Sequence, residues 1–496
     1  MTDPIVTAPA GDPGHDRRTL ALVVLCAGML MIILDQTITN VALPSIRRDL
    51  GFSPSGLAWV VNAYLVAFGG LLLLAGRLGD LVGRTRVFAA GLALFTAASL
   101  ACGLATSSGM LVAARFVQGA GGALTSAVIL GMIVTLFPEP GEQGRAIGVY
   151  SFVAAGGAAV GLLAGGVLTH ALSWHWIFFV NVPIGLATLV AARVVLAPER
   201  GPGLRGGADV TGGVLVTAGL MLTVTTIVGA AEHGWGSGRT LGLGAVSLLL
   251  LAGFVARQAR AAHPLLPLRL FGSRAVTGAN VVQMFMVAGM FGFLFIGTLY
   301  MQEVLGYDEI ETGLAIVPVA VAIGALSLGL SPRLVARFGA RAVLLPGLAL
   351  IVGGLALLTR APADAVYAVD LLPVTLLLGV GAGLVLPARL TLALSGATPA
   401  DSGLASGRVN TTQQVGGALG LAVLATLSSS RSDALAAGGE GRAEALLGGY
   451  HLAFGVAAAS VVVAIALAVA VLRPAAATAP AGAAEEPDLG SEPAAA

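Results

Sequence analysis

Residues 56–86 read GLAWVVNAYLVAFGGLLLLAGRLGDLVGRTR, and the rest of the chain repeats their pattern. An apolar run long enough to cross a hydrocarbon core of roughly 30 Å as a helix leads into a short polar loop. An unpaired peptide group in lipid costs on the order of several kcal/mol, so a spanning segment is expected to be helical. The stretch therefore predicts a membrane-spanning helix that ends in a glycine- and arginine-rich turn.

Similar apolar runs recur along the chain, and we predict fourteen spans in all. They cover 19–43, 56–76, 87–105, 110–136, 145–168, 175–197, 210–230, 240–258, 275–301, 312–331, 341–359, 366–390, 404–428 and 450–472. A membrane barrel would instead show alternating segments of about ten residues. The predicted fold class is an all-α integral membrane protein.

Composition excludes several classes of function. Of the 496 residues 57% are apolar and 10% charged, whereas soluble domains have roughly 45–50% and about 25%. A net charge of +1 offers no basic field for nucleic acid. There is no lysine, and the only cysteines, Cys26 and Cys102, lie in apolar runs, so no metal site is expected. The six histidines fall in tails, loops or span ends, which argues against an enzyme.

The chain carries an internal repeat. Displaced by 259 residues, the glycines and alanines at 144, 146, 148, 157, 159 and 161 align with identical residues at 403, 405, 407, 416, 418 and 420. At 256 residues, Arg77, Leu78 and Gly83 align with Arg333, Leu334 and Gly339. Two related six-helix halves are therefore predicted, with two helices inserted between them, an arrangement common in transporters.

Arginine placement predicts the orientation in the membrane. With the amino terminus inside, seventeen arginines fall on the cytoplasmic side and six outside, so both termini are expected to be cytoplasmic. The predicted domains are a disordered tail (1–18), an amino-terminal bundle (19–197), two inserted helices with linkers (198–272), a carboxy-terminal bundle (273–472) and a second tail (473–496).

Two charged residues lie inside predicted spans, where a charge costs at least about 2.5 kcal/mol. Asp35 lies in the first span, and because burial favours the neutral form of a carboxyl group it is a candidate proton carrier. It could instead be held ionised by an arginine, or cap a broken helix before Pro44. Arg115 in the fourth span, with Gln118 one turn later, could pair with a carboxylate and control its proton, or could anchor two helices.

Uncharged polar residues and glycines inside spans suggest a cavity and close helix packing. Amide side chains in four predicted spans are candidates for a substrate cavity, although bonds between helices would also explain each of them. These candidates are Asn40, Gln118, Asn280, Gln283, Asn410 and Gln413. Gly157, Gly161 and Gly165 form a stripe on the fifth span that would let another helix approach.

The loop GRLGDLVGRTR (76–86) is the most informative polar segment. Its glycines permit a tight turn, and Asp80 could accept from a helix amino terminus or pair with an arginine of the other half as a latch. A plain solvated turn is the alternative. The predicted gating residues are Gly76, Arg77, Asp80, Gly83 and Arg84.

Several of these motifs, in this order, resemble those of major facilitator exporters, specifically the fourteen-span drug:proton antiporters of the EmrB/QacA type. The similar segments are LDQTITNVALPSI (34–46), GRLGDLVGRTR (76–86), RFVQGAGGA (115–123), WHWIFFVNVPIG (174–185) and SGRVNTTQQVGGALG (406–420). The resemblance implies proton coupling by Asp35 and Arg115 and gating by the loop with Asp80 and Arg84. The fifth-span antiporter signature departs from the family at Leu162, where proline is usual.

The predicted function is proton-coupled export of amphipathic small molecules such as antibiotics, by alternating access. The departure at Leu162 leaves a proton-coupled symporter for uptake as the alternative. No cofactor or metal is expected, since protons are the coupling ion. The expected partners are the small-molecule substrate and the lipid bilayer of the inner (plasma) membrane, with a monomer sufficient for function.

Overall fold

The computed structural model describes residues 13–199, 201, 203, 207–262, 264–266, 274–394 and 402–472. The predicted tails at 1–18 and 473–496 lie largely or wholly outside these residues. Every regular element in the described part is helical. The α-helices are α1 (Pro13–Leu50), α2 (Trp59–Val82), α3 (Arg84–Gly103), α4 (Ser108–Leu136), α5 (Pro140–Ala171), α6 (Trp176–Phe179), α7 (Asn181–Val195), α8 (Val210–His233), α9 (Gly238–Arg260), α10 (Arg274–Leu299), α11 (Glu309–Ala325), α12 (Ser331–Phe338), α13 (Ala340–Leu358), α14 (Leu372–Leu394), α15 (Ser402–Ala437) and α16 (Arg442–Val471). The shorter helical segments are the 3₁₀ helix η1 (Gly56–Ala58) and the π-helices η4 (Tyr300–Val304), η5 (Leu326–Leu330) and η6 (Tyr367–Leu371).

Thirteen stretches of helix in the described residues are long and apolar enough to cross a membrane. The all-helical membrane fold is thereby confirmed. The thirteenth predicted span, 404–428, lies in α15, which is not among these thirteen stretches of helix. Polar side chains such as Gln413 and Gln414 lower its apolar content, yet α15 packs lengthwise on α2, α10 and α16 as part of the bundle.

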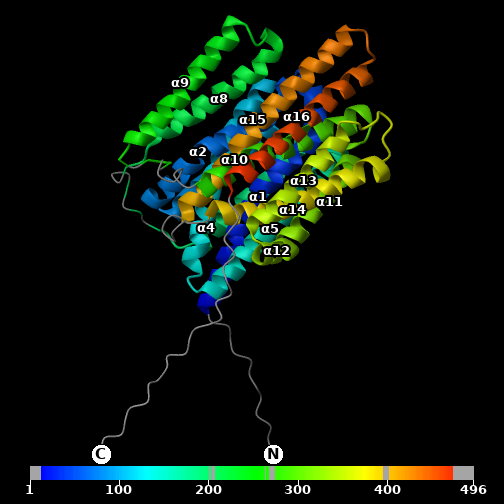
Figure 1. The fold of residues 1–496 in the computed structure, drawn as a ribbon. Coiled ribbons are helices and arrows are strands. Elements are labelled where there is room, and N and C mark those ends of the chain that lie inside the picture. Colours follow the sequence, from blue (N-terminus) through cyan, green and yellow to red (C-terminus); the bar gives the residue numbers. More distant parts are fainter. Residues whose placement is uncertain are drawn as a thin grey trace, which may run out of the picture.

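The described helices can be assigned to the predicted segments, whose bounds stay a prediction (Figure 1). The predicted amino-terminal bundle contains α1 to α7, the carboxy-terminal bundle α10 to α16, and the inserted segment α8 and α9. The hairpin of α8 and α9 stands at one edge of the molecule, and α8 packs on both α2 and α15. On α2 the fit is close, because a Cβ added at Gly70 would meet the Thr217 Cα at 3.1 Å.

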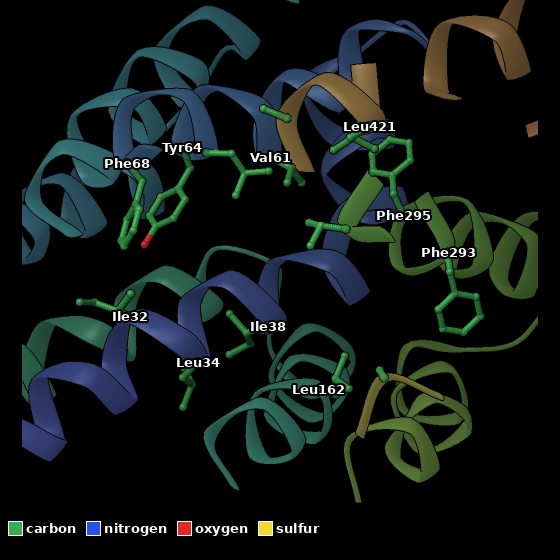
Figure 2. Packing of buried hydrophobic residues seen from close by; sticks show 14 of the residues in the cluster. Ile32, Leu34, Ile38, Val61, Tyr64, Phe68, Leu162, Phe293, Phe295 and Leu421 are labelled. Atoms are coloured by element: carbon green, nitrogen blue, oxygen red, sulfur yellow. The ribbon is translucent and has the colours of Figure 1, made fainter. Parts of the chain in front are cut away.

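The two bundles meet mainly where α5 packs on α11 and where α2 packs on α15. Buried apolar side chains fill this contact region (Figure 2). Ile32 and Ile38 of α1, Val61 of α2 and Leu421 of α15 are among those that contribute. In this region the halves are therefore in apolar contact.

The repeated polar loops adopt the same backbone turn. Gly83 between α2 and α3 has φ +107°, and Gly339 between α12 and α13 has φ +84°. Residues with a side chain rarely adopt this left-handed conformation, so both positions require glycine. The alignment of Gly83 with Gly339 thus corresponds to equivalent turns in the two halves.

The glycine stripe of α5 lies against α1. A Cβ at Gly157 would meet Leu30 at 2.7 Å and one at Gly165 would meet the Ile38 carbonyl at 2.8 Å, while one at Gly161 would overlap Thr37. The α5 backbone therefore touches α1 directly, with no space for a side chain between them.

Gly161→Ala is expected to lower the free energy of unfolding by about 1–3 kcal/mol, because the added methyl group overpacks the contact between α1 and α5. Gly148→Ala is the matched control, since Gly148 lies on the same helix and a Cβ there meets nothing within 4 Å. Thermal unfolding of the purified variants in detergent measures both. Equal melting temperatures for the two would contradict the packing role.

Candidate functional site

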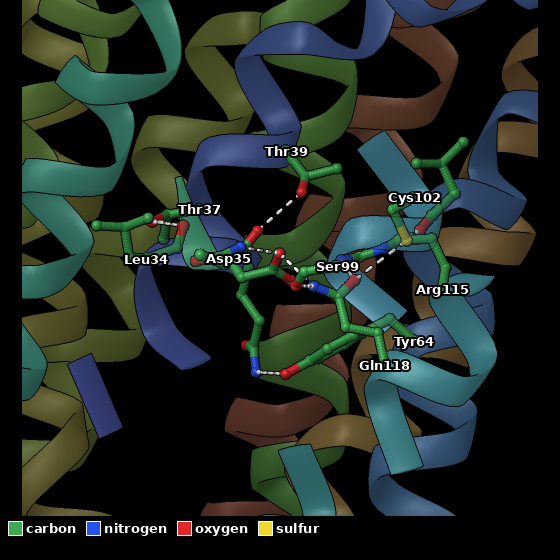
Figure 3. A network of polar contacts seen from close by, with 12 residues as sticks. Leu34, Asp35, Thr37, Thr39, Tyr64, Ser99, Cys102, Arg115 and Gln118 are labelled. Carbon is green, nitrogen blue, oxygen red and sulfur yellow. Dashed lines mark hydrogen bonds and ion pairs between the residues drawn. The ribbon is translucent and has the colours of Figure 1, made fainter. Parts of the chain in front are cut away.

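The carboxylate of Asp35 lies at the centre of a buried polar network (Figure 3). Its Oδ2 accepts from the Arg115 Nη1 at 2.6 Å. Its Oδ1 accepts from the Gln118 Nε2 at 2.7 Å and from the Asn181 Nδ2 at 3.0 Å. Asp35 itself is 0% exposed. Every side-chain contact to the carboxylate comes from a donor, which suits its ionised form.

Arg115 is held on several sides at once. Its Nε donates to the Val60 carbonyl at 2.9 Å, and its Nη1 donates to the Gln118 Oε1 at 2.7 Å. The guanidinium also lies 4.5 Å from the centre of the Tyr64 ring. The carboxylate, the amide and the aromatic ring around the guanidinium offset the cost of burying its charge. The structure thus brings together three of the polar residues that the sequence singled out in the first and fourth spans: Asp35, Arg115 and Gln118.

Close helix packing makes this site possible. In RFVQGAGGA, a Cβ at Gly119 would overlap the Tyr64 carbonyl, and one at Gly121 would meet the Phe95 main-chain nitrogen at 2.5 Å. These glycines let α4 touch α2 and α3. The short distances place Arg115 directly beside the α2 backbone and within reach of α1.

Three members of the network were not predicted from the sequence. Asn181 begins α7, while Ser99 and Cys102 lie on α3 and contact Gln118. The signal for Asn181 was present, because an amide interrupts the apolar run WIFFVNVPIG. Ser99 and Cys102 gave no such signal, since small polar residues are frequent in membrane helices.

The structure also bears on the alternatives for Asp35. An arginine partner is present, so the carboxylate is paired in this conformation. The alternative that Asp35 caps a broken helix end before Pro44 does not apply, because α1 runs unbroken through Pro44 to Leu50. Asp35 faces neither lipid nor water, so any exchange of its proton requires the network to open.

The predicted gating loop bonds within its own half. Asp80 pairs with Arg84 at 3.2 Å, and the Arg84 Nη1 donates to the Gly131 carbonyl and to Thr135. In this conformation the Asp80 partner is therefore Arg84, in place of the expected arginine of the other half. Gly76 has open space beside it.

The segment after α7 ties the inserted hairpin to this loop. The Gly203 N–H donates to the Leu81 carbonyl at 2.8 Å, the Glu199 carboxylate accepts from the Arg84 N–H, and the Arg77 Nε donates to the Gly207 carbonyl. The loop and the linker thus form one bonded layer at this end of the bundle.

A second buried carboxylate caps α8. Burial alone would raise the pKa of Asp209, but hydrogen bonds outweigh it and hold that pKa below its usual value. The donors are Arg257, the Gly212 N–H and Gln258. Asp209 therefore stays ionised near neutral pH and joins the start of α8 to the end of α9, a structural role.

Polar bonds join the two halves at the end of the bundle where α1 ends, which we call the distal end; the opposite end is the proximal end. Arg47 pairs with Glu303 at 2.7 Å. Glu309 accepts from Ser45 at 2.8 Å and lies 3.5 Å from His170. These contacts hold α1 and α5 of one half against the other half at the distal end.

The predicted substrate-cavity residues fall into separate groups. Gln118 belongs to the Asp35 network, and Asn40 bonds within its own helix. The others lie together in the carboxy-terminal half: Gln283 donates to the Val409 carbonyl at 2.8 Å, and Gln413 accepts from Arg389 at 2.9 Å. The remaining two are Asn280, which is buried, and Asn410, which is exposed.

Comparison with known proteins gives consistent results. Residues 25–421 match the model of the Major Facilitator Superfamily. The chain is 40% identical over 433 residues to the puromycin resistance protein of Streptomyces alboniger, covering 87% of this chain and 86% of that protein. It is 41% identical over 414 residues to the cephamycin export protein of Amycolatopsis lactamdurans, covering 83% and 85%. Among solved structures, a bacterial homologue of the human lysosomal transporter Spinster has a TM-score of 0.67 at 17% identity, covering 93% of this chain and 98% of that one.

Proposed function

Because this chain belongs to the Major Facilitator Superfamily and is a multi-pass membrane transporter, we propose that it exports an amphipathic small molecule in exchange for inward-moving protons. Relatives named for puromycin resistance and cephamycin export support the direction and the kind of substrate. The observation that supports proton coupling is the buried ion pair between Asp35 and Arg115.

The coupling chemistry follows from the network. Protonation would remove the charge of Asp35, and the ion pair with Arg115 would lose its attraction. Arg115 would then be a buried cation without a counter-charge, which is costly. The network would therefore rearrange, and loss of the proton would restore the arrangement of Figure 3. Proton binding at one residue can in this way favour one conformation of the bundle over another.

The arginine distribution favours a cytoplasmic proximal end, with both termini on that side and the distal end outside. In this orientation the bonds of Arg47 and Glu309 join the two halves on the external side. The loop from Gly76 to Arg84 would then lie at the cytoplasmic surface, where movement between the halves must occur for substrate to enter.

The proton gradient supplies enough energy for this task. One proton driven by about 150 mV provides on the order of 3.5 kcal/mol. That is sufficient for a concentration ratio of a few hundred for a neutral substrate, since roughly 1.4 kcal/mol corresponds to a factor of ten. No nucleotide site is required.

The test is transport in proteoliposomes with an acidic lumen and an alkaline exterior, using puromycin and cefoxitin, a cephamycin, as separate probes. Antiport predicts that at least one probe accumulates in the lumen beyond the amount trapped in protein-free liposomes. Collapse of the gradient with a protonophore is expected to remove this excess. Transport that ignores the gradient would refute proton coupling, and protein-dependent loss of a preloaded probe from the acidic lumen would instead establish symport.

A further inference from the structure

Arg389 of α14 is a buried cation with unused hydrogen-bonding capacity. Its side chain belongs to a residue only 7% exposed, and its one hydrogen-bond partner within the described residues is the Gln413 Oε1. Its Nε and Nη1 are buried without a partner. No carboxylate of the described part of the chain lies within ion-pair distance of it. Arg115 is also buried, but it has an ion pair with Asp35 and hydrogen bonds to Val60 and Gln118.

An uncompensated guanidinium is expensive to bury. A charge without a partner costs several kcal/mol in a low-dielectric interior, and unsatisfied donors add to that cost. Arginine does not lose its proton to escape the penalty. A purely structural arginine would be expected to use its donors on carbonyl groups, as Arg115 does with Val60. The buried positive charge and the unpartnered Nε and Nη1 donors of Arg389 favour the binding of an anion.

The surroundings of Arg389 are polar but neutral. Three helices meet at this level, because Ala279 of α10 and Val409 of α15 pack together with Leu392 of α14. The Arg389 side chain reaches Gln413 of α15, a neutral amide whose Oε1 accepts a hydrogen bond from it. The Arg389 guanidinium carries one positive charge, which a ligand with one negative charge would balance. A carboxylate therefore suits the site better than a phosphate dianion.

The site also lies beside the contact between the halves. A Cβ at Gly69 of α2 would lie 2.9 Å from the Gln414 Cβ, so the residue after Gln413 touches the opposite bundle. Asn410, one turn earlier on α15, is exposed. A ligand bound to Arg389 would therefore sit near the surfaces that part when the halves move, where transporters of repeated architecture hold their substrates.

We propose that Arg389, through its unpartnered Nε and Nη1, binds an organic carboxylate carried by this transporter. The proposal deepens the proposed export function by naming the charge of its substrate. Guanidinium groups bind carboxylates through charge-assisted hydrogen bonds, with the carboxylate oxygens accepting. The apolar remainder of the substrate would lie against the aliphatic side chains between the halves.

The test measures binding in neutral detergent without any gradient, by calorimetric titration with cefoxitin and with its uncharged methyl ester. The wild-type protein is expected to bind the acid at least roughly tenfold more tightly than the ester. Arg389→Gln should weaken binding of the acid roughly ten- to a hundredfold and leave the ester unchanged. Arg389→Lys should retain part of the preference. Arg337→Gln, an exposed arginine of the same half, is the matched control and should change neither affinity.

Unfolding of the ligand-free proteins provides an independent readout. Arg389→Met removes an uncompensated buried charge and is expected to raise the melting temperature, whereas loss of a structural anchor would lower it. The proposal is overturned by equal affinity of the wild-type protein for acid and ester, by failure to bind the acid, or by full binding in Arg389→Gln. Because no gradient is involved, carboxylate binding without coupled transport would refute only the export mechanism. Gradient-driven transport of puromycin alone, with no binding of the acid, would refute only the carboxylate site.

Discussion

Asp35→Asn is expected to abolish gradient-driven transport while leaving the protein folded. An amide of the same shape can still accept from Gln118 or Arg115, but it cannot take up or release a proton in the physiological range. Accumulation of the transported probe in acid-loaded proteoliposomes should fall to the level of protein-free liposomes. Exchange of labelled for unlabelled probe across the membrane without a gradient should continue, because it needs only the conformational change.

The matched control for this variant is Asp49→Asn, the same change on the same helix at an exposed carboxylate that accepts from the Trp174 Nε1. It should retain gradient-driven accumulation. Intact coupling in Asp35→Asn would remove Asp35 from the mechanism. Loss of both accumulation and exchange, in a variant with a normal melting temperature, would make Asp35 a residue of the conformational change and not the proton carrier.

Arg115→Gln is expected to have the largest effect on stability of any single substitution in the chain. It leaves the Asp35 carboxylate buried without a counter-charge, and breaking one side of a buried ion pair costs about 3–5 kcal/mol. Unfolding of the detergent-purified protein by denaturant measures the loss. A second expected result is lower transport at every pH, since the proton no longer competes with a fixed cation for the carboxylate.

The double variant Asp35→Asn/Arg115→Gln separates pairing from packing. With both charges removed, the free energy of unfolding should recover most of what Arg115→Gln alone loses, because no unpaired charge remains. Additive losses in the double variant would show that the two residues do not depend on each other, contrary to the 2.6 Å contact.

The sequence predicted the helical membrane fold, which the structure confirms, because long apolar runs are read directly from composition. It also singled out Asp35 and Arg115 as charges within membrane helices, and the structure places them in contact. Their part in proton coupling stays a prediction. Gln118 was also found, since it lies one helical turn from Arg115 on the same face.

What the sequence could not show are contacts between distant segments. Arg47 and Glu303 lie far apart in the sequence, and nothing in their local sequence indicates that they pair at 2.7 Å. Gln118 was predicted as a cavity residue and bonds to the Asp35 carboxylate of another helix, because spacing within one helix does not determine which neighbour a side chain faces. The helix α15 shows the converse: its position in the bundle comes from its neighbours, although its own composition is too polar for a membrane-span criterion.

The position of α8 affects how the two bundles of the transporter can move relative to each other. Its backbone is interlocked with α2 at Gly70 and Thr217, and its preceding linker is bonded to the loop after α2. Toward the other bundle it packs on α15, where Thr426 donates to the Ile227 carbonyl at 3.3 Å. The inserted hairpin should therefore move as one rigid body with the amino-terminal bundle and slide along α15. The conformational change would then take place between a larger body, the amino-terminal bundle with the hairpin, and a smaller one, the carboxy-terminal bundle.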